Sequence, residues 1–134
     1  MILLVLCGPP GSGKTTLSKQ LSEQYTAIRL SFDEMYCLQH KELIPYVVKA
    51  LQDEENVVVD SVYTKNVWRK LILEATKDID CKKILIYMDT PLEECLRRNS
   101  QRPSALPDFM IRDIYNSIEL PTLDEGWDDI WYYK

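Results

Sequence analysis

The sequence predicts an α/β fold, in which a parallel sheet is covered on both faces by helices. Short runs of consecutive apolar residues alternate along the chain with longer segments that carry one apolar face, a pattern typical of such a sheet. The first run, Ile2–Cys7, stops at Gly8 and two prolines, as a strand buried on both faces should. Because 134 residues suit one domain with a core that needs no disulfides, we expect a single domain over residues 1–134.

The first half of the chain predicts three strands with helical segments between them. The strands are expected at Ile2–Cys7, Ala27–Ser31 and Val57–Asp60. A helix is expected over Lys14–Tyr25, because Leu17 and Leu21 lie four residues apart and form one apolar stripe. A further helical region starts near Glu34 and is interrupted at Pro45, which is tolerated in the first turn of a helix.

The second half continues the alternation. Two more strands are expected, at Ile84–Met88 and Asp129–Tyr133. A helix is expected over Asn66–Lys77, with an apolar side formed by Trp68, Leu71, Ile72 and Ala75. Residues 90–93 match a capping box that begins a helix ending near Asn99. After a loop, a last helix should run from Pro107 to Ile118.

Composition and charge narrow the partners that the protein can have. The formal net charge is −5 and the isoelectric point is near 4.9, whereas general binding to nucleic acids or anionic membranes favours basic surfaces. A nucleic-acid end held in a local basic groove is still compatible with this balance. The four cysteines are scattered without metal-site spacing, which favours reduced thiols and a cytoplasmic protein. The first apolar run is far too short for a membrane span, so no membrane association is expected.

The segment after the first strand matches G-x-x-x-x-G-K-[ST], a nucleotide-binding pattern. Its glycines permit backbone conformations that point successive N–H groups inward, so they form an anion-binding nest at a helix N-terminus. Lys14 would bring its ammonium group to the β- and γ-phosphates, and the Thr15 hydroxyl would bind Mg²⁺. The predicted nucleotide-binding residues are Gly8, Gly11, Ser12, Gly13, Lys14, Thr15 and Thr16.

Several carboxylates follow predicted strands and should lie at the same edge of the sheet. Asp33 is interpreted as a general base that orients an acceptor hydroxyl, with capping of the next helix as an alternative role. Asp60 ends a strand, as a residue that supports Mg²⁺ should. Asp89 is a rival for that role, but it also marks a helix start, so Asp60 is preferred. A solvated turn explains the acidic cluster near the C-terminus, Asp124, Glu125, Asp128 and Asp129.

Three arginines, Arg97, Arg98 and Arg102, lie close together around the end of one predicted helix. A positive helix C-terminus that complements the helix dipole is one explanation, but Arg102 lies beyond the helix. Arginines above a triphosphate can instead make bidentate contacts where charge develops during phosphoryl transfer. We therefore interpret residues 97–107 as a lid that excludes water from the reaction.

Four segments follow one another in a recognisable order: GPPGSGKTT, LSFDEMY, VVVDSVYT and TPLEECLRRNSQRPSALPDFMIRDIYNSI. In this order they resemble the small AAA-type P-loop kinases related to bacteriophage polynucleotide 5′-kinase. The resemblance implies a three-layer P-loop NTPase fold with a five-stranded parallel sheet in the order 2-3-1-4-5. It also implies catalytic roles for Lys14, the base Asp33 and the lid arginines Arg98 and Arg102, and support of the metal or acceptor by Thr15 and Asp60.

Two positions depart from this family, and both concern the acceptor. Such polynucleotide kinases tend to carry an arginine shortly after the base aspartate, where this chain has Tyr36. They often carry an asparagine two residues after the equivalent of Asp60, where this chain has Val62.

The expected function is transfer of the γ-phosphate of ATP, with Mg²⁺, to a hydroxyl group. The acceptor is either a nucleic-acid 5′ end or a small molecule such as a nucleoside or nucleotide. The alternative is an ATP-binding module or ATPase switch without transfer. A GTPase switch is disfavoured because the chain has no N-K-x-D segment.

Overall fold

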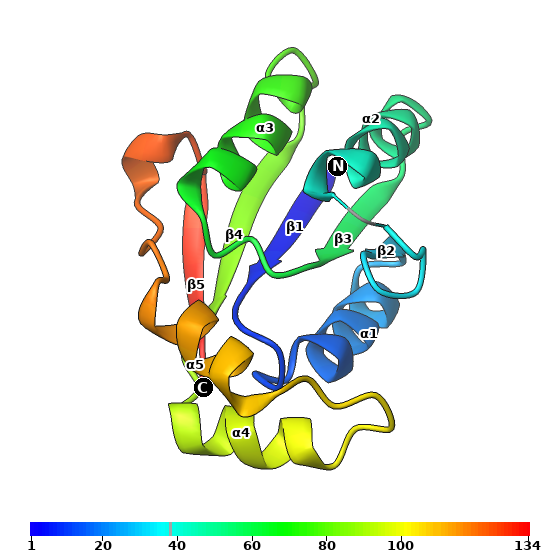
Figure 1. The fold of residues 1–134 in the computed structure, drawn as a ribbon. Coiled ribbons are helices and arrows are strands. Elements are labelled where there is room, and N and C mark those ends of the chain that lie inside the picture. The colour runs from blue at the N-terminus through cyan, green and yellow to red at the C-terminus, as the bar shows by residue number, and fades with distance from the viewer. Residues whose placement is uncertain (38) are drawn as a thin grey trace.

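The protein is built on a five-stranded parallel sheet with the strand order β2-β3-β1-β4-β5 (Figure 1). The computed structural model describes residues 1–37 and 39–134. All neighbouring strands pair in parallel, so the predicted fold and the strand order implied by the P-loop kinases are confirmed. The strands are β1 (Ile2–Cys7), β2 (Ala27–Ser31), β3 (Asn56–Asp60), β4 (Lys82–Met88) and β5 (Asp129–Tyr133).

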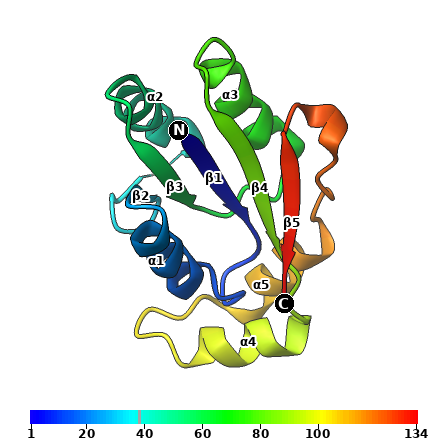
Figure 2. The same cartoon turned by 180° about the vertical axis from the view of Figure 1, so that it is seen from behind.

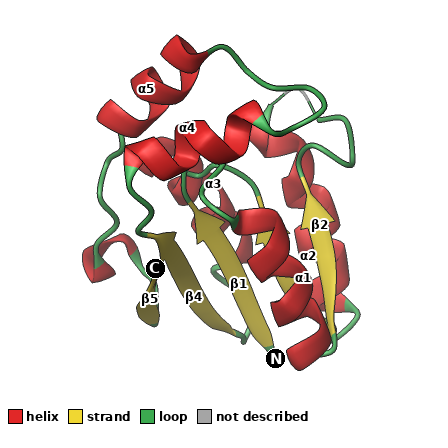
Figure 3. Ribbon diagram, turned by 90° about the horizontal axis from the view of Figure 1, so that it is seen from below, coloured by secondary structure: helices red, strands yellow, loops and turns green. Residues whose placement is uncertain are grey.

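Helices cover the two faces of the sheet and its carboxyl edge (Figures 2 and 3). On one face, α1 (Lys14–Gln24) packs through Leu17 and Leu21 against a core that includes Leu4 and Leu6 of β1. On the other face, α2 (Ile44–Gln52) and α3 (Asn66–Thr76) cover a core that includes the intervening residues of β1. Two cores, one on each side, explain why the strand reads as a continuous apolar run.

The last two helices, α4 (Leu92–Ser100) and α5 (Asp108–Asn116), lie beyond the carboxyl ends of the strands (Figure 3). Short 3-10 helices occur at His40–Leu43 and Leu123–Glu125. The loop of residues 8–13, here called the phosphate loop, leaves β1 at the same end of the sheet. α4 lies directly over this loop. This arrangement gathers the predicted site residues at one edge of the sheet.

Three local predictions are wrong. Thr90 does not cap α4; its Oγ1 donates instead to the backbone oxygen of Ser12 at 2.9 Å. In α3 the fully buried side includes Arg69, whereas Leu71 is 43% exposed. The helical region expected from Glu34 begins with a turn over residues 32–36, and α2 starts only at Ile44. Position 38 of that region lies outside the described residues.

The acidic cluster near the C-terminus is more than a solvated turn. The fully buried guanidinium of Arg69 donates from Nε to Oε1 of Glu125 at 2.8 Å and from Nη2 to Oε2 at 2.9 Å. Burial alone would lower the pKa of Arg69, but its bonds to Glu125 raise it. This pair fastens the segment before β5 onto α3.

The cysteines agree with the reduced state expected from the sequence. All four cysteines are free thiols. Burial raises the pKa of Cys7 to about 11, so this thiol is an inert part of the core. Among the described residues, we find no helix with the length and apolar character needed to cross a membrane.

Candidate nucleotide and acceptor site

The loop between β1 and α1 forms a tight cradle. Gly11 and Gly13 have positive φ values of 82° and 99°, which glycine adopts readily. A Cβ atom on Gly11 would lie 2.3 Å from the backbone oxygen of Cys95, and one on Gly13 would lie 2.9 Å from Nη1 of Arg98. The positive φ therefore requires glycine at both positions, and at Gly11 the close approach of the α4 backbone requires it as well.

Lys14 begins α1 and is buried inside the cradle. Its Nζ donates to the backbone oxygen of Pro9 at 3.0 Å. Burial lowers the pKa of its ammonium group, while the carboxylate of Asp60 acts in the opposite direction. Because a buried cation is stabilised by a nearby anion, the cradle favours phosphate.

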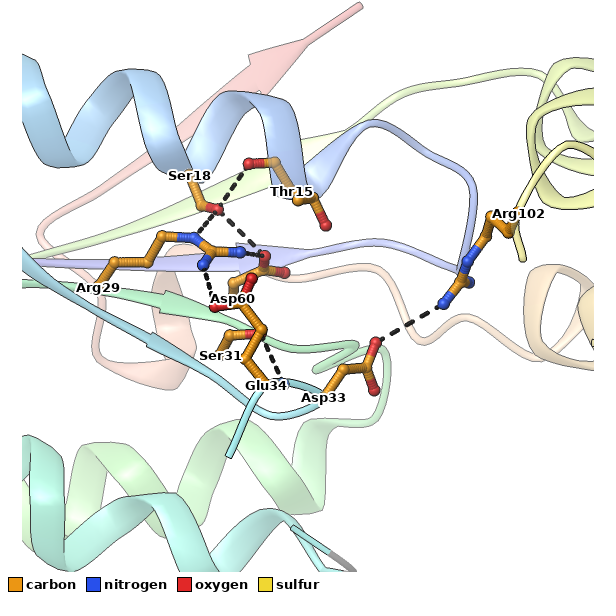
Figure 4. Close-up of polar contacts among 8 residues, drawn as sticks. All are labelled: Thr15, Ser18, Arg29, Ser31, Asp33, Glu34, Asp60 and Arg102. Atoms are coloured by element: carbon orange, nitrogen blue, oxygen red, sulfur yellow. Dashed lines mark hydrogen bonds and ion pairs between the residues drawn. The ribbon is translucent and has the colours of Figure 1, made fainter. Parts of the chain in front are cut away.

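Asp60 ends β3 and is held by a guanidinium that sequence analysis did not single out (Figure 4). Nη2 of Arg29, in β2, donates to Oδ2 of Asp60 at 2.7 Å, and Ser18 Oγ donates to the same oxygen at 3.0 Å. Arg29 also donates from Nε to Ser18 Oγ and from Nη1 to Glu34 Oε2, each at 2.6 Å. Asp60 therefore belongs to a charge network that links α1, β2 and β3.

A cleft of about 1010 Å³ opens in front of the cradle. Ligand sites commonly have volumes of about 300–1,000 Å³, so this cleft has room for a phosphate donor and an acceptor. Gly8 and Ser12 belong to the loop but not to the described lining, and Asp89 is exposed outside it. The predicted site residues that line the cleft are Gly11, Gly13, Lys14, Thr15, Thr16, Asp33, Asp60, Arg98 and Arg102.

Asp33 and Arg102 face each other in this cleft (Figure 4). Asp33 lies in the turn after β2 with its side chain 80% exposed, and its Oδ2 is 3.8 Å from Nη2 of Arg102 in the loop after α4. The structure thus brings the predicted base together with a predicted lid arginine. Within the described chain, no α-helix begins next to Asp33, so its alternative role as a helix cap is not supported.

Glu94 positions the other arginines of α4. Its Oε1 accepts a hydrogen bond from Nε of Arg98 at 2.9 Å, and its Oε2 accepts one from Nε of Arg97 at 2.9 Å. The bonds from Arg97, and then those from Arg98, lower the pKa of Glu94 to about 2. Glu94 is therefore ionised at neutral pH. Of the two arginines it binds, Arg98 lines the cleft next to the cradle.

A second part of the cleft is lined by aromatic rings, among them those of Phe32, Tyr36 and His40. The imidazole of His40 stacks on Phe32 with 5.0 Å between ring centroids and on Trp68 with 4.1 Å. Its Nδ1 lies 3.1 Å from Oγ of Ser61. Burial lowers the pKa of His40, so the ring is neutral at neutral pH.

The residues present fit a nucleoside triphosphate with Mg²⁺. The loop has the glycine conformations of an anion-binding nest and a buried ammonium group, and Thr15 lines the same cleft. In the part of the chain that the structure describes, no group of three or more His, Cys, Asp or Glu could hold a metal ion. A magnesium ion here would therefore be held by Thr15, phosphate oxygens and water, with support from Asp60.

Comparison with known proteins identifies the family. Residues 3–113 match the family described as AAA domain. The chain belongs to the AAA-domain family. With the cradle geometry, this membership assigns ATP and Mg²⁺ as its cofactors and confirms the predicted nucleotide-binding character.

Two curated relatives of this AAA-domain protein are named as kinases. The L-seryl-tRNA(Sec) kinase of Methanococcus maripaludis is 29% identical over 143 residues, which cover 95% of this chain and 56% of that protein. The adenylate kinase of Clostridium novyi is 32% identical over 108 residues, which cover 73% of this chain and 48% of that protein. The chain thus spans about half the length of these relatives.

Solved structures share the fold at low sequence identity. Kti12 of Chaetomium thermophilum in complex with ADP-AlF3 has a TM-score of 0.76 at 16% identity, over 98% of this chain and 88% of that one. A fungal RNA kinase has a TM-score of 0.78 at 18% identity, over 99% of this chain and 38% of that one. The expected resemblance to P-loop kinases is confirmed at the level of the family. A specific relationship to the bacteriophage polynucleotide kinase is not confirmed by these comparisons.

Three groups around the site were missed in the sequence, namely Arg29, His40 and Glu94. A charged residue inside the short strand Ala27–Ser31 is a signal that could have revealed Arg29. Glu94 precedes Arg98 by four residues, the spacing of a helical ion pair. No local pattern marks His40, because its stacking partners Phe32 and Trp68 come from separate segments.

Proposed function

We propose that this AAA-domain protein is a kinase that transfers the γ-phosphoryl group of ATP to a hydroxyl acceptor. The observation that carries the proposal is the approach of Asp33 and Arg102, 3.8 Å apart, in the cleft that also contains Lys14. A carboxylate that can receive a proton and a guanidinium that can receive developing negative charge are the groups that phosphoryl transfer needs. The two relatives named above, both kinases, support this assignment.

The oxygen of the acceptor hydroxyl bonds to the γ-phosphorus, and Asp33 accepts the proton that this hydroxyl loses. The bond between that phosphorus and the β,γ-bridging oxygen breaks, and ADP leaves. Lys14, Arg98 and Arg102 stabilise the negative charge on the phosphoryl oxygens. Mg²⁺, when bound near Thr15 and Asp60, neutralises phosphate charge.

We further propose that residues 1–134 act as one cytoplasmic kinase domain and that residues 97–107 are its lid. The lid contains Arg98 and Arg102, both of which line the cleft. Its closure would exclude water, so that the acceptor hydroxyl rather than water receives the phosphoryl group. The acceptor is the hydroxyl of a nucleic-acid 5′ end or of a small alcohol such as a nucleoside or nucleotide.

The test is transfer of labelled γ-phosphate to 5′-hydroxyl DNA and RNA, nucleosides and sugar alcohols. Asp33→Asn should lower turnover of the preferred acceptor by about 10²–10⁴-fold with little change in ATP affinity. Asp89→Asn is the matched control, because this exposed carboxylate also follows a strand but does not line the cleft among the described residues. ATP turnover indifferent to every acceptor would support a switch instead, and loss of ATP binding in Asp33→Asn would show that Asp33 is not the base.

A further inference from the structure

The positive charges of the cleft are concentrated on the side that would hold the phosphate donor. Among the described residues that line it, the cationic side chains are Lys14, Arg98 and Arg102. Lys14 belongs to the phosphate loop, and Arg98 lies against that loop beside Gly13. Arg102 already faces a carboxylate, that of Asp33. A bound triphosphate would occupy these cations, so little positive charge is left for a second anionic ligand.

The remaining lining is uncharged and largely aromatic or aliphatic. It includes Phe32, Tyr36, His40, Val62, Leu106 and Ile114. His40 adds no charge, because burial lowers its pKa. The imidazole is also fixed between Phe32 and Trp68, so this wall is a preformed surface. A phosphate or phosphodiester would find no guanidinium or ammonium group on it, although such groups are the usual partners of phosphates.

Tyr36 stands out within this wall. The residue is 90% exposed although it lines the cleft. Its backbone is left-handed, with φ at 56°, and its N–H donates to the backbone oxygen of Asp33 at 3.1 Å. A bulky residue in this conformation costs free energy, and such residues are concentrated at functional sites. The turn therefore presents a free aromatic ring three residues from the predicted base.

We propose that the acceptor is an uncharged alcohol with a flat ring, of the nucleoside class, and that Tyr36 binds it by stacking. This inference rests on the kinase function proposed above and names the substrate class for the same cleft. The ring of the acceptor lies on Tyr36 and against the wall of Phe32 and His40, which directs its hydroxyl group toward Asp33. The neutral wall disfavours a nucleotide phosphate or a nucleic-acid chain in the same position.

The experiment compares nucleosides, nucleoside 3′-monophosphates and 5′-hydroxyl oligonucleotides as acceptors of labelled phosphate. The nucleosides should have the lowest KM, and a 3′-phosphate should raise it by about tenfold or more. Tyr36→Ala should raise the nucleoside KM by about tenfold or more without changing the KM for ATP, and Tyr36→Phe should retain the wild-type value. Tyr36→Arg should shift the preference toward the 3′-monophosphates. Tyr46→Ala and Tyr46→Arg are the controls, because Tyr46 is 56% exposed on α2 and outside the described lining.

A second arm measures nucleoside binding directly, by calorimetry in the presence of ADP and Mg²⁺. Preferred transfer to oligonucleotides or nucleotides, or a nucleoside KM unchanged in Tyr36→Ala, would overturn this inference and leave the kinase function standing. Failure to phosphorylate any alcohol would overturn the kinase function. In that case the binding arm still decides the inference, since nucleosides that do not bind, or that bind Tyr36→Ala equally well, refute the stacking site.

Discussion

Replacement of Arg29 by methionine tests whether Asp60 depends on its ion pair. Arg29 and Asp60 side chains are only 12% and 7% exposed, and removal of one partner of a buried pair leaves the other charge uncompensated. The methionine retains most of the apolar stem, so loss of packing is small. We expect the free energy of unfolding to fall by about 2–4 kcal/mol, below the full cost of a deeply buried pair because Ser18 still donates to Asp60.

The assay is urea unfolding followed by tryptophan fluorescence. With a denaturant slope of about 2 kcal/mol per molar, the midpoint should fall by about 1–2 M. Glu34→Gln is the matched control, because it removes the other carboxylate partner of Arg29 where that partner is 59% exposed; it should cost less than about 1 kcal/mol. Arg29→Met combined with Asp60→Asn should recover about 2 kcal/mol relative to the sum of the single changes. Equal costs for Arg29→Met and Glu34→Gln would refute the reasoning.

Three further outcomes are expected. Lys14→Ala should weaken ATP binding at least about tenfold and abolish transfer. The urea midpoint should stay unchanged or rise, because a buried ammonium group is removed. Retained ATP affinity would contradict the assignment of this loop to phosphate binding. Gly11→Ala should destabilise the fold more than Gly126→Ala in the same unfolding assay, although both positions have positive φ. A Cβ on Gly11 would lie 2.3 Å from a backbone oxygen, whereas one on Gly126 would lie 3.8 Å from a flexible leucine carbon. Burial lowers the pKa of His40 below its usual 6.5, so the unfolded chain binds a proton at a higher pH than the folded chain does. The contribution of His40 to the free energy of unfolding is therefore complete above about pH 6.5 and is lost as the pH falls. His40→Phe should remove that part of the pH dependence, and an unchanged profile would show that the stack does not depend on a neutral imidazole.

The sheet and the phosphate loop could be predicted because their causes are local. Ile2–Cys7 is apolar at every position, which is typical of a strand with a core on each side. The glycine spacing after it is dictated by the loop itself. Residues that follow strands were also correctly expected at one edge of the sheet, and Asp33 and Asp60 do line one cleft.

Two of the errors arise from contacts between segments distant in sequence. Thr90 looked like a helix cap, but its hydroxyl donates a hydrogen bond to the backbone oxygen of Ser12, 78 residues away. Leu71 was expected on the buried side of its helix, but Arg69 is buried there instead, paired with Glu125, which lies 56 residues later. Propensity and periodicity contain no information on such partners, so a polar residue that finds one across the fold is assigned to the wrong role or the wrong face.

The contact of Gly11 with Cys95 also limits how the sequence can change. The phosphate loop packs directly against α4, and at Gly11 there is no space between them for a single methyl group. A larger residue in the loop would have to lift the helix, and Arg98 with it, away from the donor phosphates. The loop and α4 therefore pack as one unit, in which the position of the helix depends on the absence of a side chain at Gly11.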